Sequence, residues 1–136
     1  VLIPCRNTPQ DYVEAVKWNR LAANQGFANA QFNLGVMYYK GQGVPQDFAQ
    51  AMKWYRLAAN QGFANAQLNL GVMYAIGNGV PKDYVIAYMW LNFSAAQGNK
   101  NAVKSRDITA KRMTPAQIAE AQKMAREWKP VKPKSQ

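Results

Sequence analysis

RLAANQGFANAQ occupies residues 20–31, and the same twelve letters return at residues 56–67. The copy is part of a longer repeat, because sliding the chain by 36 positions aligns residues 11–46 with residues 47–82. At 26 of those 36 positions the two residues are identical. A third, diverged copy spans residues 83–112. A period near 36 residues is typical of solenoids built from stacked helical hairpins.

Each copy predicts two helices joined by a short glycine turn. An aspartate stands at the expected N-cap of the first helix, at Asp11, Asp47 and Asp83, and Glu14 and Gln50 complete a capping box in the first two copies. Apolar residues at helical spacing then predict a buried stripe on this helix. The stripe comprises Ala15, Trp18 and Ala22 in the first copy, Ala51, Trp54 and Ala58 in the second, and Trp90 in the third.

Glycines end the first helix of each copy and interrupt the second. Those suited to the left-handed residue that closes a helix are Gly26, Gly62 and Gly98. The second helices are then expected over residues 28–40, 64–76 and 100–112. Gly35 and Gly71 lie in the middle of such helices, where glycine costs about 1 kcal/mol relative to alanine. We therefore expect a neighbouring helix to cross there at close range.

The stretch MTPAQIAEAQKMAREW, residues 113–128, predicts a capping helix over 115–128 at the end of the array. Thr114 is a suitable N-cap, Pro115 a suitable first helical residue, and Gln117 completes a capping box. Residues 129–136 are rich in lysine and proline and predict a disordered basic tail. The predicted fold is therefore all-α: one right-handed α-solenoid over residues 11–128, with about seven helices in antiparallel pairs.

Residues 1–10 precede the first repeat. Their end, TPQDY at 8–12, resembles VPQDF at 44–48, which closes a repeat. The segment is thus interpreted as the remnant of a removed repeat or leader. Alternatively, the first helix presents an open N-terminal end that forms a homo-oligomer. The single cysteine, Cys5, leaves the redox compartment undecided.

The pattern A-x-K-W-x-R-L-A-A-x-Q-G-x-A-x-A-Q-x-x-L-G-x-M-Y-x-x-G-x-G-V-x-x-D resembles the Sel1-like repeat family, a relative of the tetratricopeptide repeats. The match is close over residues 11–82 and partial over 83–112. The resemblance implies a bacterial adaptor or scaffold that holds other proteins, in an envelope or host-interaction setting, so the periplasm or secretion is the favoured location. It also implies that helices 28–40, 64–76 and 100–112 line the concave face.

The side chains on these three helices predict a binding groove for a peptide or partner protein. Amide and hydroxyl groups at equivalent positions form a polar ladder that suits an extended backbone. These are Asn29, Asn33, Asn65, Asn69, Asn101 and Ser105. Beside them on the same face are Val36, Tyr39, Lys40, Val72 and Ile108. The competing interpretation is that the asparagines are solvated surface and the apolar residues pack between helices.

The net charge of +10 is concentrated at the C-terminal end. Residues 1–98 hold seven Lys/Arg and four Asp/Glu, whereas residues 99–136 hold ten and three. Lys104, Lys111 and Arg112 therefore mark a basic end patch, and the alternative function is binding of anionic polymers or acidic partners there. A charged, solvated end cap explains the same residues. Nucleic acid is disfavoured because no aromatic residues suited to base stacking are interleaved.

Catalysis finds little support in the sequence. The chain has no histidine, which removes the commonest general base and zinc ligand. It shows no nucleotide-binding motif and no cluster of metal ligands, so we expect a protein that is not an enzyme and uses no cofactor and no metal. The longest apolar run, at residues 84–91, is too short for a transmembrane segment.

Overall fold

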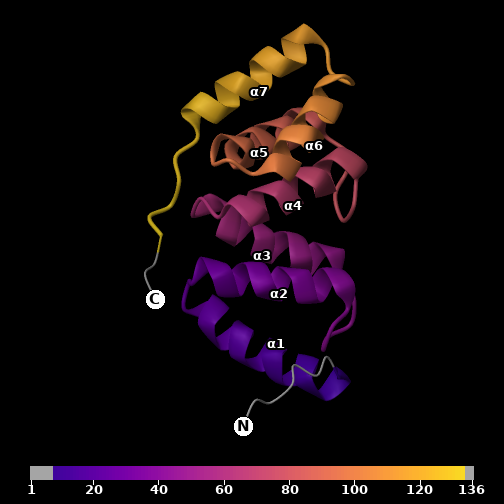
Figure 1. Cartoon of the computed structure of the whole chain (residues 1–136), viewed down its shortest axis with the longest axis vertical. Coiled ribbons are helices and arrows are strands. Elements are labelled where there is room, and N and C mark those ends of the chain that lie inside the picture. Colours follow the sequence, from indigo (N-terminus) through magenta and orange to yellow (C-terminus); the bar gives the residue numbers. More distant parts are fainter. Residues whose placement is uncertain (1–7, 134–136) are drawn as a thin grey trace.

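The computed structural model describes residues 8–133, which contain seven α-helices and no strand. The helices are α1 (Pro9–Asn24), α2 (Ala28–Lys40), α3 (Phe48–Asn60), α4 (Ala64–Ile76), α5 (Tyr84–Ala96), α6 (Lys100–Ala110) and α7 (Pro115–Glu127). From α1 to α6 each helix packs on the next, and α7 packs on α5. Figure 1 shows the resulting stack, with α1 at one end and α7 at the other. The predicted all-α solenoid is confirmed.

The helix starts follow the predicted caps at most positions. Asp47 and Asp83 are N-caps whose side chains accept the backbone N–H groups of Gln50 and Ile86. The first helix differs, because Thr8 is its N-cap and Asp11 is the third helical residue. These two residues form the capping box that was predicted for Asp11 and Glu14. Thr8 is followed by Pro9, which is pre-organised for a first helical position, so α1 begins earlier than its repeat equivalents.

At the other end of the chain, the capping box of Thr114 and Gln117 at the start of α7 is as predicted. The segment predicted as disordered follows this helix. Residues 129–133 lie extended beside the stack (Figure 1), and the Val131 N–H donates to the carbonyl oxygen of Asn60 at 2.7 Å. Trp128 holds the start of this segment, because its ring packs on Phe93 at 4.4 Å between ring centroids. The amino-acid composition of residues 129–136 did not reveal these two contacts. Residues 134–136 and 1–7, including Cys5, lie outside the described residues.

The tryptophan stripe is buried in two repeats and exposed in the first. Trp54 and Trp90 are 7% and 6% exposed, as predicted, but Trp18 is 63% exposed. Trp54 packs against residues of α1 and α2, which include Val16 and Leu34. Among the described residues no helix is stacked on α1 in the same way, so the prediction that Trp18 is buried is wrong.

Close helix crossings explain the two glycines in the middle of α2 and α4. A Cβ atom at Gly35 would lie 2.7 Å from the ring of Tyr55 on α3, and one at Gly71 would lie 2.7 Å from Cγ of Leu91 on α5. Contacts this short exclude a side chain, so the expected close approach is confirmed. Each second helix is therefore seated directly on the first helix of the following repeat.

Glutamine side chains connect successive repeats. Gln61 Nε2 donates to the Gly26 carbonyl oxygen at 2.8 Å and to Gln31 Oε1 at 2.9 Å. Gln97 makes the same two bonds one repeat later, to Gly62 and Gln67. The buried amides are satisfied in this way, and the bonds fix the register between repeats. None of the helices in residues 8–133 is both long and apolar enough to cross a bilayer.

A candidate binding groove across the second helices

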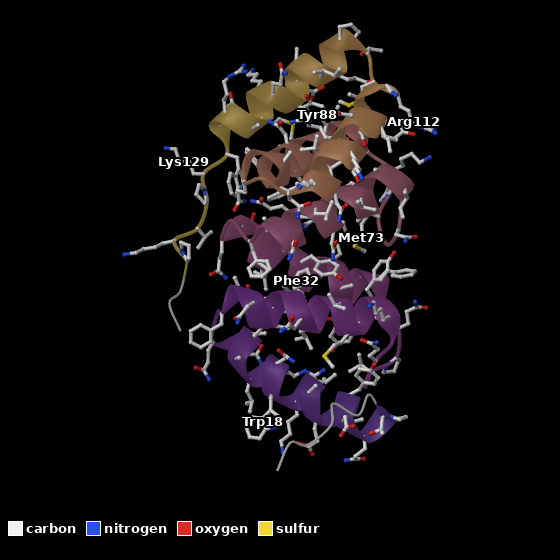
Figure 2. All side chains as sticks on the ribbon, viewed as in Figure 1. Trp18, Phe32, Met73, Tyr88, Arg112 and Lys129 are labelled. Carbon is white, nitrogen blue, oxygen red and sulfur yellow. The ribbon has the colours of Figure 1, made fainter. Side chains whose placement is uncertain are left out.

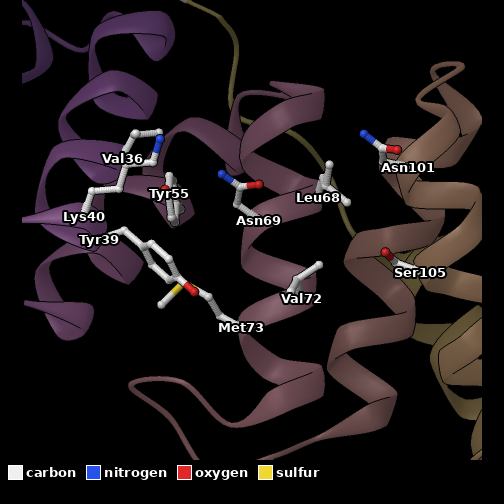
Figure 3. A pocket seen from close by; sticks show the side chains of 10 residues that line it. All are labelled: Val36, Tyr39, Lys40, Tyr55, Leu68, Asn69, Val72, Met73, Asn101 and Ser105. Atoms are coloured by element: carbon white, nitrogen blue, oxygen red, sulfur yellow. The ribbon is translucent and has the colours of Figure 1, made fainter. Parts of the chain in front are cut away.

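A hollow of about 430 Å³ opens between α2, α4 and α6, the helices that were predicted to line the concave face. Its lining residues come from all three helices and from α3 beneath them (Figure 3). They are Val36, Tyr39 and Lys40 of α2, Tyr55 of α3, Leu68, Asn69, Val72 and Met73 of α4, and Asn101 and Ser105 of α6. The lining is mainly apolar and carries a few polar groups, as ligand sites in proteins usually do.

The hollow crosses the helices obliquely rather than along equivalent positions. The last turns of α2 contribute to it, then the middle of α4, then the first turns of α6. Asn101 and Ser105 stand two periods after Asn29 and Asn33, yet only the later pair lines the hollow. The predicted ladder of equivalent rungs is therefore not enclosed in this one hollow.

The structure divides the predicted groove residues into two groups. Those in the hollow are Val36, Tyr39, Lys40, Asn69, Val72, Asn101 and Ser105. The remaining four are Asn29, Asn33, Asn65 and Ile108. Asn33 donates to Asn19 Oδ1 at 3.4 Å, and Asn65 accepts from Asn99 Nδ2 at 3.1 Å. Asn29 accepts the N–H of Ala30 through its own side chain. The side chains of these three asparagines thus make hydrogen bonds within the chain and do not line the first hollow.

Tyr55 forms part of the floor of the hollow and was missed by sequence reasoning. Its residue is 2% exposed, and its side chain is hydrogen-bonded to Asn69. Burial raises the pKa of the Tyr55 hydroxyl from 10.0 to about 12, although the Asn69 bond acts in the opposite direction. The sequence contained one indication of this residue. Gly35 predicted that a neighbouring helix approaches α2 closely, but it did not identify Tyr55 as the side chain at that contact. Leu68 and Met73 were also missed, since they read as ordinary core positions.

A second hollow, of about 330 Å³, lies one helical turn further along α4 and α6. Ile108 and Arg112 line this one, together with Ala75, Ile76, Lys82, Tyr84 and Thr109. Of the predicted basic end patch, Arg112 (labelled in Figure 2) lines this second hollow, whereas Lys104 and Lys111 are exposed and line neither hollow.

The charges around the two hollows are positive. Lys40 lines the first, Lys82 and Arg112 line the second, and no acidic residue among residues 8–133 lines either. The one ion pair in this part of the chain joins Arg106 to its neighbour Asp107 at 3.4 Å. Within the same residues, no group of three or more potential metal ligands lies together. The groove thus offers apolar surface, amide groups and cations.

A family model described as the Sel1 repeat matches this sequence three times in succession, at residues 6–27, 28–63 and 64–99. The last two matches each begin at a second helix, so they group α2 with α3 and α4 with α5. These are the helix pairs that Gly35 and Gly71 bring into close contact. The sequence resemblance to this family is confirmed.

Two solved structures show the same architecture. A protective antigen present in uropathogenic Escherichia coli strains, displaying an SLR fold, is 38% identical, with a TM-score of 0.86 over 89% of this chain and 26% of that chain. A Sel1 repeat protein from Oxalobacter formigenes is 40% identical, with a TM-score of 0.69 over 71% of this chain and 38% of that chain. The chain therefore spans less than two fifths of either solved chain. No curated protein shows a significant match.

Proposed function

This chain belongs to the Sel1 repeat family, whose repeats typically mediate protein–protein interaction, and we propose that it is a non-catalytic scaffold. It holds an extended segment of a partner protein across the hollow between α2, α4 and α6. The observation that carries this proposal is the hollow itself, where apolar side chains from the first two repeats lie beside a few polar groups, among them Asn101 and Ser105 of the third repeat.

The lining suits an extended peptide for two physical reasons. Val36, Leu68 and Val72 are partly exposed and offer apolar contact area, which supplies about 25 cal/mol for each Å² removed from water. Asn69 and Asn101 present amides that can both donate to and accept from a peptide backbone. Three helices stacked about 10 Å apart cover 20 to 30 Å, or roughly six to nine extended residues.

A matched pair of variants tests the proposal, because Asn33 and Asn69 are repeat equivalents and only Asn69 lines the hollow. Binders are first selected from a random peptide library displayed on phage and synthesised with a fluorescent label. Their dissociation constants are then measured by anisotropy against the wild type, Asn69→Ala and Asn33→Ala. We expect Asn69→Ala to weaken binding about tenfold, as a lost hydrogen bond to a buried partner does. Asn33→Ala is expected to bind like the wild type.

The melting temperature of each variant serves as the control for folding. Two outcomes would place the peptide outside the hollow and refute the proposal. One is an equal loss of affinity in Asn69→Ala and Asn33→Ala. The other is an unchanged affinity in the double variant of Asn69→Ala with Lys40→Ala.

The exposed lysines of α6 favour a second candidate function, which is binding of anionic polymers or acidic partners at the basic end. Lys104 and Lys111 are exposed and lie two turns apart, on one side of the helix. Binding of this kind predicts an affinity for polyglutamate that falls steeply with salt. It also predicts that Lys104→Gln with Lys111→Gln abolishes that affinity and leaves the selected peptides unaffected. A flat salt response would rule it out.

A further inference from the structure

The second hollow repeats part of the first, one period later in the sequence. Tyr39, Lys40, Val72 and Met73 line the first hollow, and their equivalents 36 residues on are Ala75, Ile76, Ile108 and Thr109. All four of these line the second hollow. The same pair of helix faces, shifted by one repeat, thus forms both concavities.

The second hollow exposes large apolar side chains. Ile76 is 54% exposed and Ile108 is 59% exposed. At the position of Ile76, the other two repeats carry the cations Lys40 and Arg112. Contact of an isoleucine side chain with water is unfavourable. Two exposed isoleucines in one concavity are therefore typical of an interaction surface.

Cations without acidic neighbours surround these isoleucines. Lys82 and Arg112 line the second hollow, and Lys40 lines the first. The nearest acids in sequence are engaged elsewhere. Asp83 caps α5 by accepting from Ile86, and Asp107 pairs with Arg106. A ligand that spans both hollows therefore meets a net positive field.

We propose that the second hollow is a repeat-related subsite of the binding groove, and that the partner segment is an acidic extended peptide with two apolar anchors. The inference rests on the proposed function, because it assumes that the first hollow holds a peptide. Subsites about 10 Å apart correspond to about three extended residues, so the anchors stand at positions i and i+3. One anchor contacts Leu68 and Val72, the other contacts Ile76 and Ile108, and carboxylates between and beside them face Lys40, Lys82 and Arg112.

The probes are fluorescein-labelled nonapeptides of glutamate with two leucines. In the first the leucines are three residues apart, in the second they are adjacent, and in the third every glutamate is replaced by lysine. We expect the first peptide to bind at least tenfold more tightly than the second and the lysine peptide not to bind. Ile108→Ser and the pair Lys82→Gln with Arg112→Gln are each expected to weaken the first peptide tenfold or more. All three positions are on the surface, so the fold is retained.

Two controls separate this inference from the proposed function. Leu57→Ser removes an exposed apolar residue from α3, Lys123→Gln removes a cation from α7, and neither residue lines either hollow. If Asn69→Ala weakens binding but the second-hollow variants do not, the groove binds peptides and the second subsite is refuted. If polyglutamate without leucine binds equally well and Ile108→Ser has no effect, attraction is electrostatic only and the anchored model is refuted. If the peptide binds and neither set of variants matters, both proposals fail.

Discussion

The Tyr55 hydroxyl lies beneath the groove, where burial raises its pKa to about 12. An unfolded chain loses this proton near pH 10, whereas the folded chain keeps it until about pH 12. The contribution of this group to the free energy of unfolding is therefore fully present below pH 10 and is lost as the pH rises toward 12. Between pH 10 and pH 12 the free energy of unfolding falls by roughly 2 kcal/mol through this group.

We predict that Tyr55→Phe removes this part of the alkaline destabilisation. The measurement is urea unfolding at several pH values between 9 and 11.5, for the wild type and the variant. Tyr88→Phe is the matched control, because it removes a half-buried tyrosine hydroxyl away from the groove. All other groups are the same in the wild type and both variants, so the difference between the three pH profiles is the informative quantity. An identical pH slope in the wild type and Tyr55→Phe would contradict the prediction.

At the scale of the helices, Gly71 sets how closely α4 approaches α5. An added Cβ atom would lie 2.7 Å from Leu91 Cγ and 3.1 Å from the Ala87 carbonyl oxygen. Leu91 is fully buried and has little room to move. Overpacking of this kind costs about 1 to 3 kcal/mol, against a gain of about 1 kcal/mol in helix propensity.

We therefore predict that Gly71→Ala lowers the free energy of unfolding by about 1 kcal/mol, as measured in urea. Leu91→Ala makes room for the new methyl group, so the double variant should lose less than the sum of the single losses. Gly71→Ala at wild-type stability or above would show that α4 and α5 separate at little cost.

The helices were predictable because their signals are local. The glycine turns, the capping aspartates of the second and third repeats and the bounds of α2 and α4 follow from side chains a few residues apart. Trp18 and Asp11 were mispredicted because the repeat pattern assumes that equivalent residues have equivalent neighbours. In residues 8–133 no helix packs on the side of α1 that faces away from α2, so Trp18 stays exposed. Thr8 serves as the N-cap of α1 in place of Asp11.

The groove was predictable only in part, for a geometric reason. The family resemblance indicated which helices face it, and the equivalent positions on those helices then gave seven of its lining residues. It did not reveal that the hollow crosses those helices obliquely, because that angle depends on how the repeats rotate as they stack. Asn69 and Asn33 have nearly the same sequence context, and only the packed structure separates them. Tyr55 comes from the outer helix and reaches the floor beside Gly35.

For the molecule as a whole, the exposed face of α1 bears on self-association. Val13, Trp18 and Leu21 are each about half exposed or more. In the second repeat, Trp54 is the equivalent of Trp18 and packs with Leu34 and Met37 of α2, while Gln61 donates to Gln31 of the same helix. Two periods after those three α2 residues, α6 carries Arg106, Thr109 and Val103. The equivalent face of α6 is therefore less apolar, which argues against a head-to-tail contact between α1 and α6.

We predict that the chain forms a closed dimer through α1 at high micromolar concentration, with each copy covering the Trp18 of the other. Sedimentation velocity measures the mass, and the emission maximum of tryptophan is expected to shift to the blue as the dimer forms. Trp18→Ser with Leu21→Ser is expected to remain monomeric at every concentration. A monomeric mass for the wild type at high micromolar concentration would rule out this association.

The bond between Val131 and Asn60 also affects how the chain folds. Neighbouring repeats fold through short-range contacts, which form quickly. The extended C-terminal segment instead closes a loop around the whole third repeat, and its docking site exists only after α3 and α5 have assembled. We expect such a contact to form after the transition state, so that its loss speeds unfolding and leaves the folding rate unchanged. The segment is thus a kinetic latch, which lengthens the lifetime of the folded state without guiding its formation.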